Sequence, residues 1–275
     1  MIVPRPENAP DQVAIYMIVN GNKVLQSVPE DAANILPQLD SKAVASLWQH
    51  AAYRARIGTY QGTPVYLLDT DEPVELAGFE SLPLRQLLHR VDSQLFALAG
   101  RACQVAYFIR THLFCSQCGQ GLEEVTDELA VYCRTCDYRT YPRISPCIIV
   151  AVYRGHGDSA EILLAHGVRH PEGLYSVLAG FVESGETLEQ CLAREVFEET
   201  GVDVECIEYV MSQPWPFPHS LMMGFTARYR DGDVTPDGNE VLAANWFTFN
   251  ALPKTPPPGT IAAQLIDAAR TKCGC

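Results

Sequence analysis

Residues 180–202 read GFVESGETLEQCLAREVFEETGV, and they predict a tight loop followed by a helix over 187–200. Thr187 can cap the start of this helix, with Gln190 three residues on as its capping-box partner. Gly201 supplies the left-handed residue on which helices commonly end. The apolar positions at helical spacing are Leu188, Leu192 and Val196. The stretch therefore predicts an amphipathic helix with one side packed on a core.

On the same helix, Glu195, Glu198 and Glu199 stand at spacings i, i+3 and i+4 that place them on one face. Their like charges repel unless a cation lies among them. Carboxylate oxygens suit Mg²⁺ or Mn²⁺, which keep waters and bridge to phosphates. Glycines at 180 and 185 are expected to let the loop turn sharply and bring backbone oxygens to the same cations. The alternative is a solvated acidic face.

Four cysteines form two close pairs separated by fourteen residues: Cys115, Cys118, Cys133 and Cys136. This spacing lets two short turns present four thiolates to one tetrahedral zinc ion. Four cysteines leave no open position for water or substrate, so we expect a structural rather than a catalytic zinc. Redox pairs are the alternative, but neither pair has the strand-to-helix context of a thioredoxin-like centre.

The 23-residue stretch matches the Nudix box, G-x5-E-x7-R-E-U-x-E-E-x-G-U with U a bulky aliphatic residue, at every fixed position. These positions are Gly180, Glu186, Arg194, Glu195, Val196, Glu198, Glu199, Gly201 and Val202. The complete match argues against a mere acidic surface. A resemblance to the Nudix hydrolases implies cleavage of a nucleoside diphosphate linked to another group.

A second motif, residues 212–220, reads SQPWPFPHS and resembles the S-Q-P-W-P-F-P-x-S motif of the NADH pyrophosphatase branch, also described as NAD-capped RNA hydrolases. Its prolines favour an extended backbone around Trp215 and Phe217, whose rings could face a purine or pyridine ring. A loop packed against the core is the alternative. The resemblance runs from about residue 85 to the C-terminus.

The resemblance implies an α+β fold: a Nudix α/β/α sandwich with a mixed sheet, preceded by the zinc ribbon and a small strand-rich N-terminal domain. We expect the divisions 1–92 (N-terminal domain), 93–112 (connecting helix), 113–142 (zinc ribbon) and 143–275 (catalytic domain). In the last division, apolar runs and helical spacing predict alternating strands and helices. The expected strands lie at 147–153, 162–165, 204–212 and 221–229, and a last helix lies near 260–270.

The resemblance further implies hydrolysis of NAD(H) to nicotinamide mononucleotide and AMP, and removal of a 5′ NAD cap from RNA, by a homodimer with more than one catalytic Mg²⁺ or Mn²⁺ ion. The implied metal ligands are Glu195, Glu199, Glu240 and the backbone carbonyl of Ala179. Glu198 is a further ligand or base, Arg194 orients the carboxylates, and Glu186 supports them. The general base is open among Glu198, Glu199 and Glu240.

Substrate contacts are carried over from the family more loosely. They are Phe181, Tyr141, Glu128, Gln213, Pro214, Trp215, Pro216, Phe217, Pro218, His219, Ser220, Ala262 and Arg85. For Glu128 and Arg85, an ordinary surface charge is the alternative, and no independent feature of the sequence argues against it.

The net charge of −13 argues against a protein that mainly grips nucleic acid through its backbone phosphates. A local basic patch of Arg134, Arg139 and Arg143 could compensate near the ribbon. The chain has no apolar run of about 18 residues and no signal-peptide pattern at its N-terminus, so we expect a cytoplasmic protein. The alternative functions are a Nudix hydrolase of ADP-ribose or a dinucleoside polyphosphate, and a zinc-ribbon RNA-binding protein.

Overall fold

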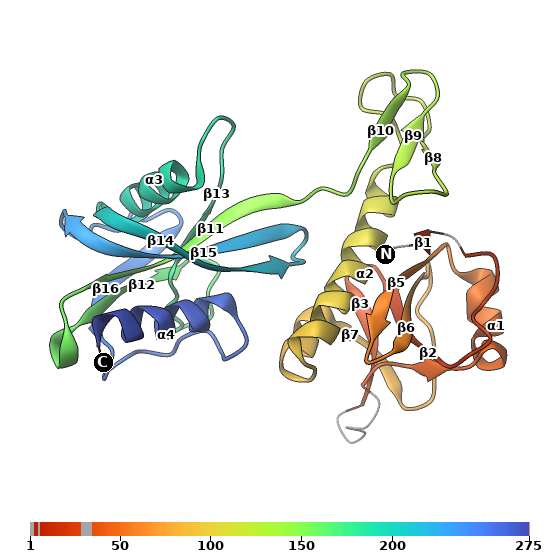
Figure 1. Cartoon of the computed structure of the whole chain (residues 1–275), viewed down its shortest axis with the longest axis horizontal. Coiled ribbons are helices and arrows are strands. Elements are labelled where there is room, and N and C mark those ends of the chain that lie inside the picture. The colour runs from red at the N-terminus through yellow and green to blue at the C-terminus, as the bar shows by residue number, and fades with distance from the viewer. Residues whose placement is uncertain (1–2, 5, 29–34, 275) are drawn as a thin grey trace. The chain divides into compact units, whose positions relative to one another are not determined.

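The computed structural model describes residues 3–4, 6–28 and 35–274, which form two compact units (Figure 1). The first unit contains Met1–Arg143 together with Pro216–His219. The second contains Ile144–Trp215 and Ser220–Cys275. The tetrapeptide 216–219 thus groups with the first unit, although the strands on either side of it belong to the second. In the described part of the chain, no helix is long and apolar enough to span a membrane.

The second unit is built on a mixed sheet with the strand order β14-β15-β11-β12-β16, and β13 pairs with β11. Strand β11 is parallel to β15 and antiparallel to β12 and β13. The bounds are β11 Ser145–Arg154, β12 Glu161–Gly167, β13 Leu178–Phe181, β14 Asp203–Trp215, β15 Ser220–Asp231 and β16 Val241–Thr248. A short 3-10 turn, η2 Gly157–Ser159, joins β11 to β12.

Two helices, α3 (Leu188–Thr200) and α4 (Ile261–Cys273), cover opposite faces of this sheet (Figure 1). Successive residues of a strand point to opposite faces. Accordingly, Ile148 of β11 packs in the same cluster as the apolar residues of α3, and Ile149 packs with those of α4. This arrangement confirms the predicted α/β/α sandwich with a mixed sheet.

Helix α3 begins and ends as its sequence predicts. The Thr187 N–H donates to Gln190 Oε1 (2.9 Å) and the Gln190 N–H donates to Thr187 Oγ1 (3.2 Å), which completes the capping box. Gly201 has φ +70° and donates its N–H to the Phe197 carbonyl (2.7 Å). Because Leu192 and Val196 are fully buried, the apolar stripe fixes which side of the helix faces away from the sheet.

Three features of this unit differ from the sequence prediction. The order of elements does not alternate regularly between strands and helices, because three strands precede α3 and three more precede α4. Strands β13 and β16 were not predicted. Strand β13 has only four residues, and β16 is defined by its pairing with β12 rather than by a clear local pattern.

The first unit contains a sheet ordered β1-β5-β6-β2-β3-β7, with β4 paired to β2. Its strands are β1 Val3–Pro4, β2 Ala14–Asn20, β3 Lys23–Ser27, β4 Gln38–Leu39, β5 Tyr53–Tyr60, β6 Thr63–Asp69 and β7 Phe79–Pro83. Helix α2 (Ser93–Thr111) lies where a connecting helix was expected, and it packs on one face of the sheet. Helix α1 (Ser41–His50), capped by Asp40, packs on the other face and was not predicted. A 3-10 helix, η1 Leu84–His89, precedes α2.

The segment after α2 forms a small three-stranded sheet ordered β10-β9-β8. Its strands are β8 Glu123–Glu124, β9 Val131–Cys133 and β10 Tyr138–Thr140. These strands are only two or three residues long, so their backbone hydrogen bonds alone cannot hold the segment folded.

Candidate active site and zinc site

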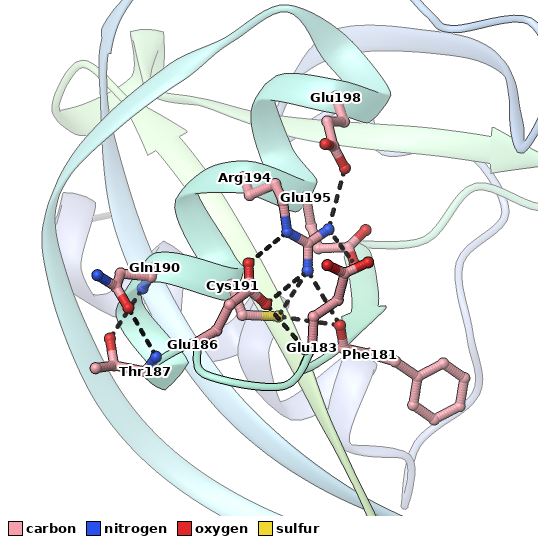
Figure 2. Close-up of polar contacts among 9 residues, drawn as sticks. All are labelled: Phe181, Glu183, Glu186, Thr187, Gln190, Cys191, Arg194, Glu195 and Glu198. Carbon is pink, nitrogen blue, oxygen red and sulfur yellow. Dashed lines mark hydrogen bonds and ion pairs between the residues drawn. The ribbon is translucent and has the colours of Figure 1, made fainter.

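The guanidinium of Arg194 joins the loop before α3 to the helix itself (Figure 2). It donates from Nε and Nη2 to the two carboxylate oxygens of Glu186, at 2.6 and 2.8 Å. Its Nη1 donates to Glu195 (2.9 Å) and to Glu198 (3.0 Å), and Nη2 also donates to the Phe181 carbonyl (3.2 Å). One arginine therefore holds three carboxylates and the end of β13.

The Glu186 carboxylate is held by hydrogen bonds from the loop and from helix α3. It receives the forked bond from Arg194 and also accepts the Glu183 N–H at 2.9 Å. These bonds stabilise the carboxylate, and they lower the pKa of Glu186 to about 2. Gly185 lies in the same loop with φ +95°, a conformation that favours glycine. Glu186 is thus a permanent anion that orients Arg194.

Gly180 is required for a reason different from the predicted sharp turn. It lies in extended strand β13, opposite Ile148 of β11. A Cβ placed on Gly180 would lie 1.9 Å from Cδ of Glu195 and 2.2 Å from its Oε1. The Glu195 carboxylate therefore rests directly against the backbone at residue 180, and only glycine leaves room for it.

The three clustered glutamates of α3, Glu195, Glu198 and Glu199, have different environments. Glu199 is only 9% exposed, and its pKa is raised to about 8 by burial and then by the charges of Glu195 and Glu240. The side chain of Glu195 is 15% exposed, and burial raises its pKa despite the contact with Arg194. Glu198 is 59% exposed and pairs with Arg194. The predicted convergence on one face therefore describes Glu195 and Glu199 better than Glu198.

A cavity of about 360 Å³ collects three of the four predicted metal ligands, Ala179, Glu199 and Glu240. They come from β13, from the last turn of α3 and from the residue before β16. Glu195 lies beside them, since it touches Gly180 and its charge acts on Glu199. Carboxylate and carbonyl oxygens are the ligands of hard divalent cations, so this donor set fits Mg²⁺ or Mn²⁺.

Two further cavity residues, Arg169 and His170, carry no prediction as site residues. His170 Nδ1 accepts the Gly167 N–H at 3.1 Å, and burial lowers the pKa of this histidine. It thus stabilises the loop after β12 as a neutral acceptor. Only the fold brings these residues to the cavity, because no motif surrounds them in the sequence.

The predicted substrate residues of the second unit surround the start of α4 and the end of β13. Phe181 exposes 57% of its surface beside Gly180, whereas Ser220 and Ala262 are buried. The side-chain amide of Gln213 donates to the Gly259 carbonyl and accepts the Ile261 N–H, both at 2.9 Å. Gln213 therefore ties β14 to the first turn of α4. Pro214 is exposed and Trp215 is partly buried against the α4 side of the core.

The remaining loop residues, Pro216, Phe217, Pro218 and His219, belong to the first unit. The guanidinium carbon of Arg85 lies 4.7 Å from the centre of the Phe217 ring. A Cβ added to Gly100 of α2 would lie 2.8 Å from Pro216, so this proline packs closely on the helix. Arg85 and the residues 216–218 line a second cavity, of about 410 Å³. Pro216 is buried and Phe217 is partly buried, and an aromatic wall that faces a substrate ring stays a prediction.

Tyr141 and Glu128 lie together at the ribbon. The Tyr141 hydroxyl donates to Glu128 Oε1 at 3.2 Å, and Arg139 pairs with the same carboxylate. Arg134 pairs with Glu123 at 2.8 Å. Two arginines of the expected basic patch are therefore neutralised by neighbouring acids, which weakens the case for RNA binding at this surface.

The thiol groups of Cys115, Cys118, Cys133 and Cys136 lie within 4.8 Å of one another. In the described residues, this is the one group of three or more histidine, cysteine or acidic side chains gathered so closely. Backbone N–H groups of Cys118 and Gln117 lower the pKa of Cys115 to about 7, which favours the thiolate. Gly119 takes φ +72° directly after the second thiol. The cluster fits one structural zinc ion with no open position.

Comparisons with known proteins match both units. Residues 144–267 match the NUDIX domain, and residues 13–107 match the NADH pyrophosphatase-like rudimentary NUDIX domain. The NAD-capped RNA hydrolase NudC of Erwinia tasmaniensis is 48% identical over 241 residues, which cover 88% of this chain and 87% of that protein. The protein of the same name from Pectobacterium atrosepticum is 46% identical over 249 residues, covering 90% and 92%.

A solved structure of a NUDIX hydrolase from Nitrosomonas europaea is 29% identical and covers 58% of this chain and 90% of its own, with a TM-score of 0.45.

Proposed function

This chain belongs to the family of Nudix hydrolases named NAD-capped RNA hydrolase NudC, and we propose that it hydrolyses the pyrophosphate bond of NAD(H) and removes the 5′ NAD cap from RNA. The products from NADH are reduced nicotinamide mononucleotide and AMP. The observation that carries the proposal is the cavity lined by Ala179, Glu199 and Glu240, beside a Glu195 held by Arg194. Mg²⁺ or Mn²⁺ is the proposed cation there.

The proposed role of each residue at the cavity follows from its environment. Bound at these oxygens, a divalent cation would lower the pKa of water and offset the charge of the phosphates. Arg194 and Glu186 hold Glu195 in place, because their hydrogen bonds fix the side chain against β13. Glu199 and Glu240 line the cavity, whereas Glu198 does not, so we propose the general base among the first two. Without a cation, burial and the neighbouring carboxylates raise the pKa of Glu199 to about 8, so a cation bound there would displace a proton near neutral pH.

The substrate residues remain proposals. Phe181, exposed at the edge of this site, is proposed to stack on a base or pyridine ring. Arg85 and Phe217 border the second cavity, and Tyr141 and Glu128 form a hydrogen-bonded pair. The four-part domain division, the homodimer and a cytoplasmic location also remain proposals; equilibrium sedimentation tests the homodimer.

A product assay tests the proposed function. The full-length protein is incubated with Mn²⁺ and, in parallel, with NADH, an NAD-capped RNA, ADP-ribose and a dinucleoside polyphosphate. We expect reduced nicotinamide mononucleotide plus AMP from NADH, and 5′-monophosphate RNA from the capped transcript. Faster cleavage of ADP-ribose or of the polyphosphate would instead identify a different Nudix substrate. Metal-independent RNA affinity without turnover would favour a binding protein.

Gly180→Ala should lower kcat/KM for NADH by about a hundredfold, the loss that a displacement near 1 Å can cause at a catalytic group. The new methyl group occupies the space of the Glu195 carboxylate, 1.9 Å from its carbon, so this side chain must move. Gly121→Ala is the matched control, because its Cβ would meet no atom within 4 Å. Equal kinetics in the two variants would show that the Glu195 position does not matter.

A further inference from the structure

Asp237 lies in the segment between β15 and β16, three residues before Glu240, and no motif marks it in the sequence. Its carboxylate accepts the backbone N–H of Glu240, at 3.2 Å from Oδ1 and 3.1 Å from Oδ2. It also accepts the Val241 N–H at 2.8 Å. Gly238, with φ +74°, donates its N–H to the Val241 carbonyl at 3.0 Å. These bonds close a tight turn whose last residue is Glu240.

The backbone of Asp237 also bonds to the end of helix α3, on the other side of the cavity from the turn. Its N–H donates to the carbonyl of Glu199 at 3.2 Å, and the nearby Thr235 N–H donates to the carbonyl of Thr200 at 2.8 Å. Glu240 is fixed from a third direction, because its carbonyl accepts the Val168 N–H at 3.0 Å. One residue therefore connects the end of α3, which carries Glu199, to the turn that carries Glu240.

Asp237 brings a further negative charge to a site that is already acidic. It is among the negative charges that raise the pKa of Glu199, after those of Glu195 and Glu240. Backbone donors at Val241 and Glu240 lower the pKa of Asp237 itself, so it remains ionised. A fourth carboxylate adds repulsion to an acidic site. Its stabilising role must therefore come from the hydrogen bonds that it accepts.

We infer that Asp237 is a positioning residue that holds Glu240 opposite Glu199 and so sets the affinity of the site for its divalent cation. This inference rests on the proposed function, since it takes both glutamates as ligands. Residues that orient metal ligands by hydrogen bonding typically change metal affinity by about 10- to 100-fold when they are removed. Because Asp237 is exposed, its removal should leave the core intact.

The test compares Asp237→Ala with Asp237→Asn and with Asp233→Ala. Mn²⁺ binding to the full-length protein is measured by electron paramagnetic resonance without substrate, and kcat for NADH is measured at saturating Mn²⁺. We expect Asp237→Ala to raise the Mn²⁺ dissociation constant about tenfold and to leave the metal-saturated kcat within about threefold. Asp237→Asn keeps an acceptor oxygen and should recover most of the affinity. Asp233→Ala removes the same charge from an exposed position of the same segment and should bind Mn²⁺ as the wild type does.

Three outcomes would overturn the inference: unchanged Mn²⁺ affinity in Asp237→Ala, equal losses in Asp237→Ala and Asp237→Asn, or an equal loss in Asp233→Ala. The first would show that the turn forms without the carboxylate, and the other two would point to charge rather than to hydrogen bonding. The proposed function fails separately, when the wild-type protein itself binds no Mn²⁺ or does not cleave NADH.

Discussion

Glu199→Gln lowers kcat for NADH about a thousandfold at saturating Mn²⁺, within the range expected when a group that exchanges protons in the transition state is lost. The substitution keeps the shape of a side chain that is 9% exposed in the cavity, but it removes the negative charge and the exchangeable proton. Glu198→Gln, in the exposed neighbour that pairs with Arg194, is the matched comparison and should lose much less. Steady-state rates of NADH cleavage over a Mn²⁺ titration measure both.

The pH dependence of the free energy of unfolding tests whether Glu199 is a buried carboxylate with a raised pKa. In the metal-free protein the pKa of Glu199 is about 8, against an ordinary value of 4.5. Between these values the folded state holds a proton that the unfolded state has released. The free energy of unfolding of the wild type therefore falls as pH rises from about 5 to 8, by up to about 1.4 kcal/mol per pH unit from this group. Glutamine cannot titrate, so the variant lacks this contribution.

In EDTA, thermal melting at pH 6 and pH 9 should thus show a smaller loss of stability in Glu199→Gln than in the wild type. If Glu199→Gln cleaved NADH as fast as the wild type at saturating metal, Glu199 would not be a catalytic residue. A variant that melts far below the wild type at pH 9 would contradict the assignment of a buried, repelled carboxylate.

Local sequence patterns predicted the parts of the site that depend on neighbours in the chain. The capping box at Thr187 and the left-handed Gly201 were both readable, because each bond spans only a few residues. The thiol cluster was readable because the spacing of two close cysteine pairs is typical of a zinc site. The Nudix box marked both Arg194 and Glu186, but their contact across the seven residues between them comes from the structure.

What the sequence did not disclose depends on contacts between distant segments. Gly180 was predicted as a turn residue, whereas the structure places it in a strand against the Glu195 carboxylate. Asp237 belongs to no motif, and its link to Glu199 is a backbone bond between segments far apart in the chain. The sequence left residues 212–220 open between an aromatic wall and a packed loop, and it did not disclose that residues 216–219 group with the first unit. In each case the partner is fixed by the tertiary fold, so no local pattern reports it.

Cys133→Ala is expected to reduce the zinc content from about one ion per chain to none and to unfold residues 113–142. Binding of a structural zinc contributes about 10–16 kcal/mol in small zinc domains, and that energy is folding energy. The ribbon has little else to hold it: its strands are two or three residues long, and its buried residues are Cys115, Ala130, Val131 and Cys133. Elemental analysis gives the zinc content, and amide hydrogen exchange reports protection of the ribbon.

Cys206→Ala is the matched control, because Cys206 is exposed, lies outside the cluster and should retain zinc and ribbon protection. The catalytic consequence follows from where the residues lie. No residue lining the first cavity belongs to 113–142, whereas Tyr141 and Glu128, both proposed substrate contacts, do. Cys133→Ala should therefore raise KM for NADH more than it lowers kcat, in contrast to Glu199→Gln. Full zinc occupancy with three cysteines, or ribbon amides that stay protected without zinc, would show that the ribbon folds without its metal.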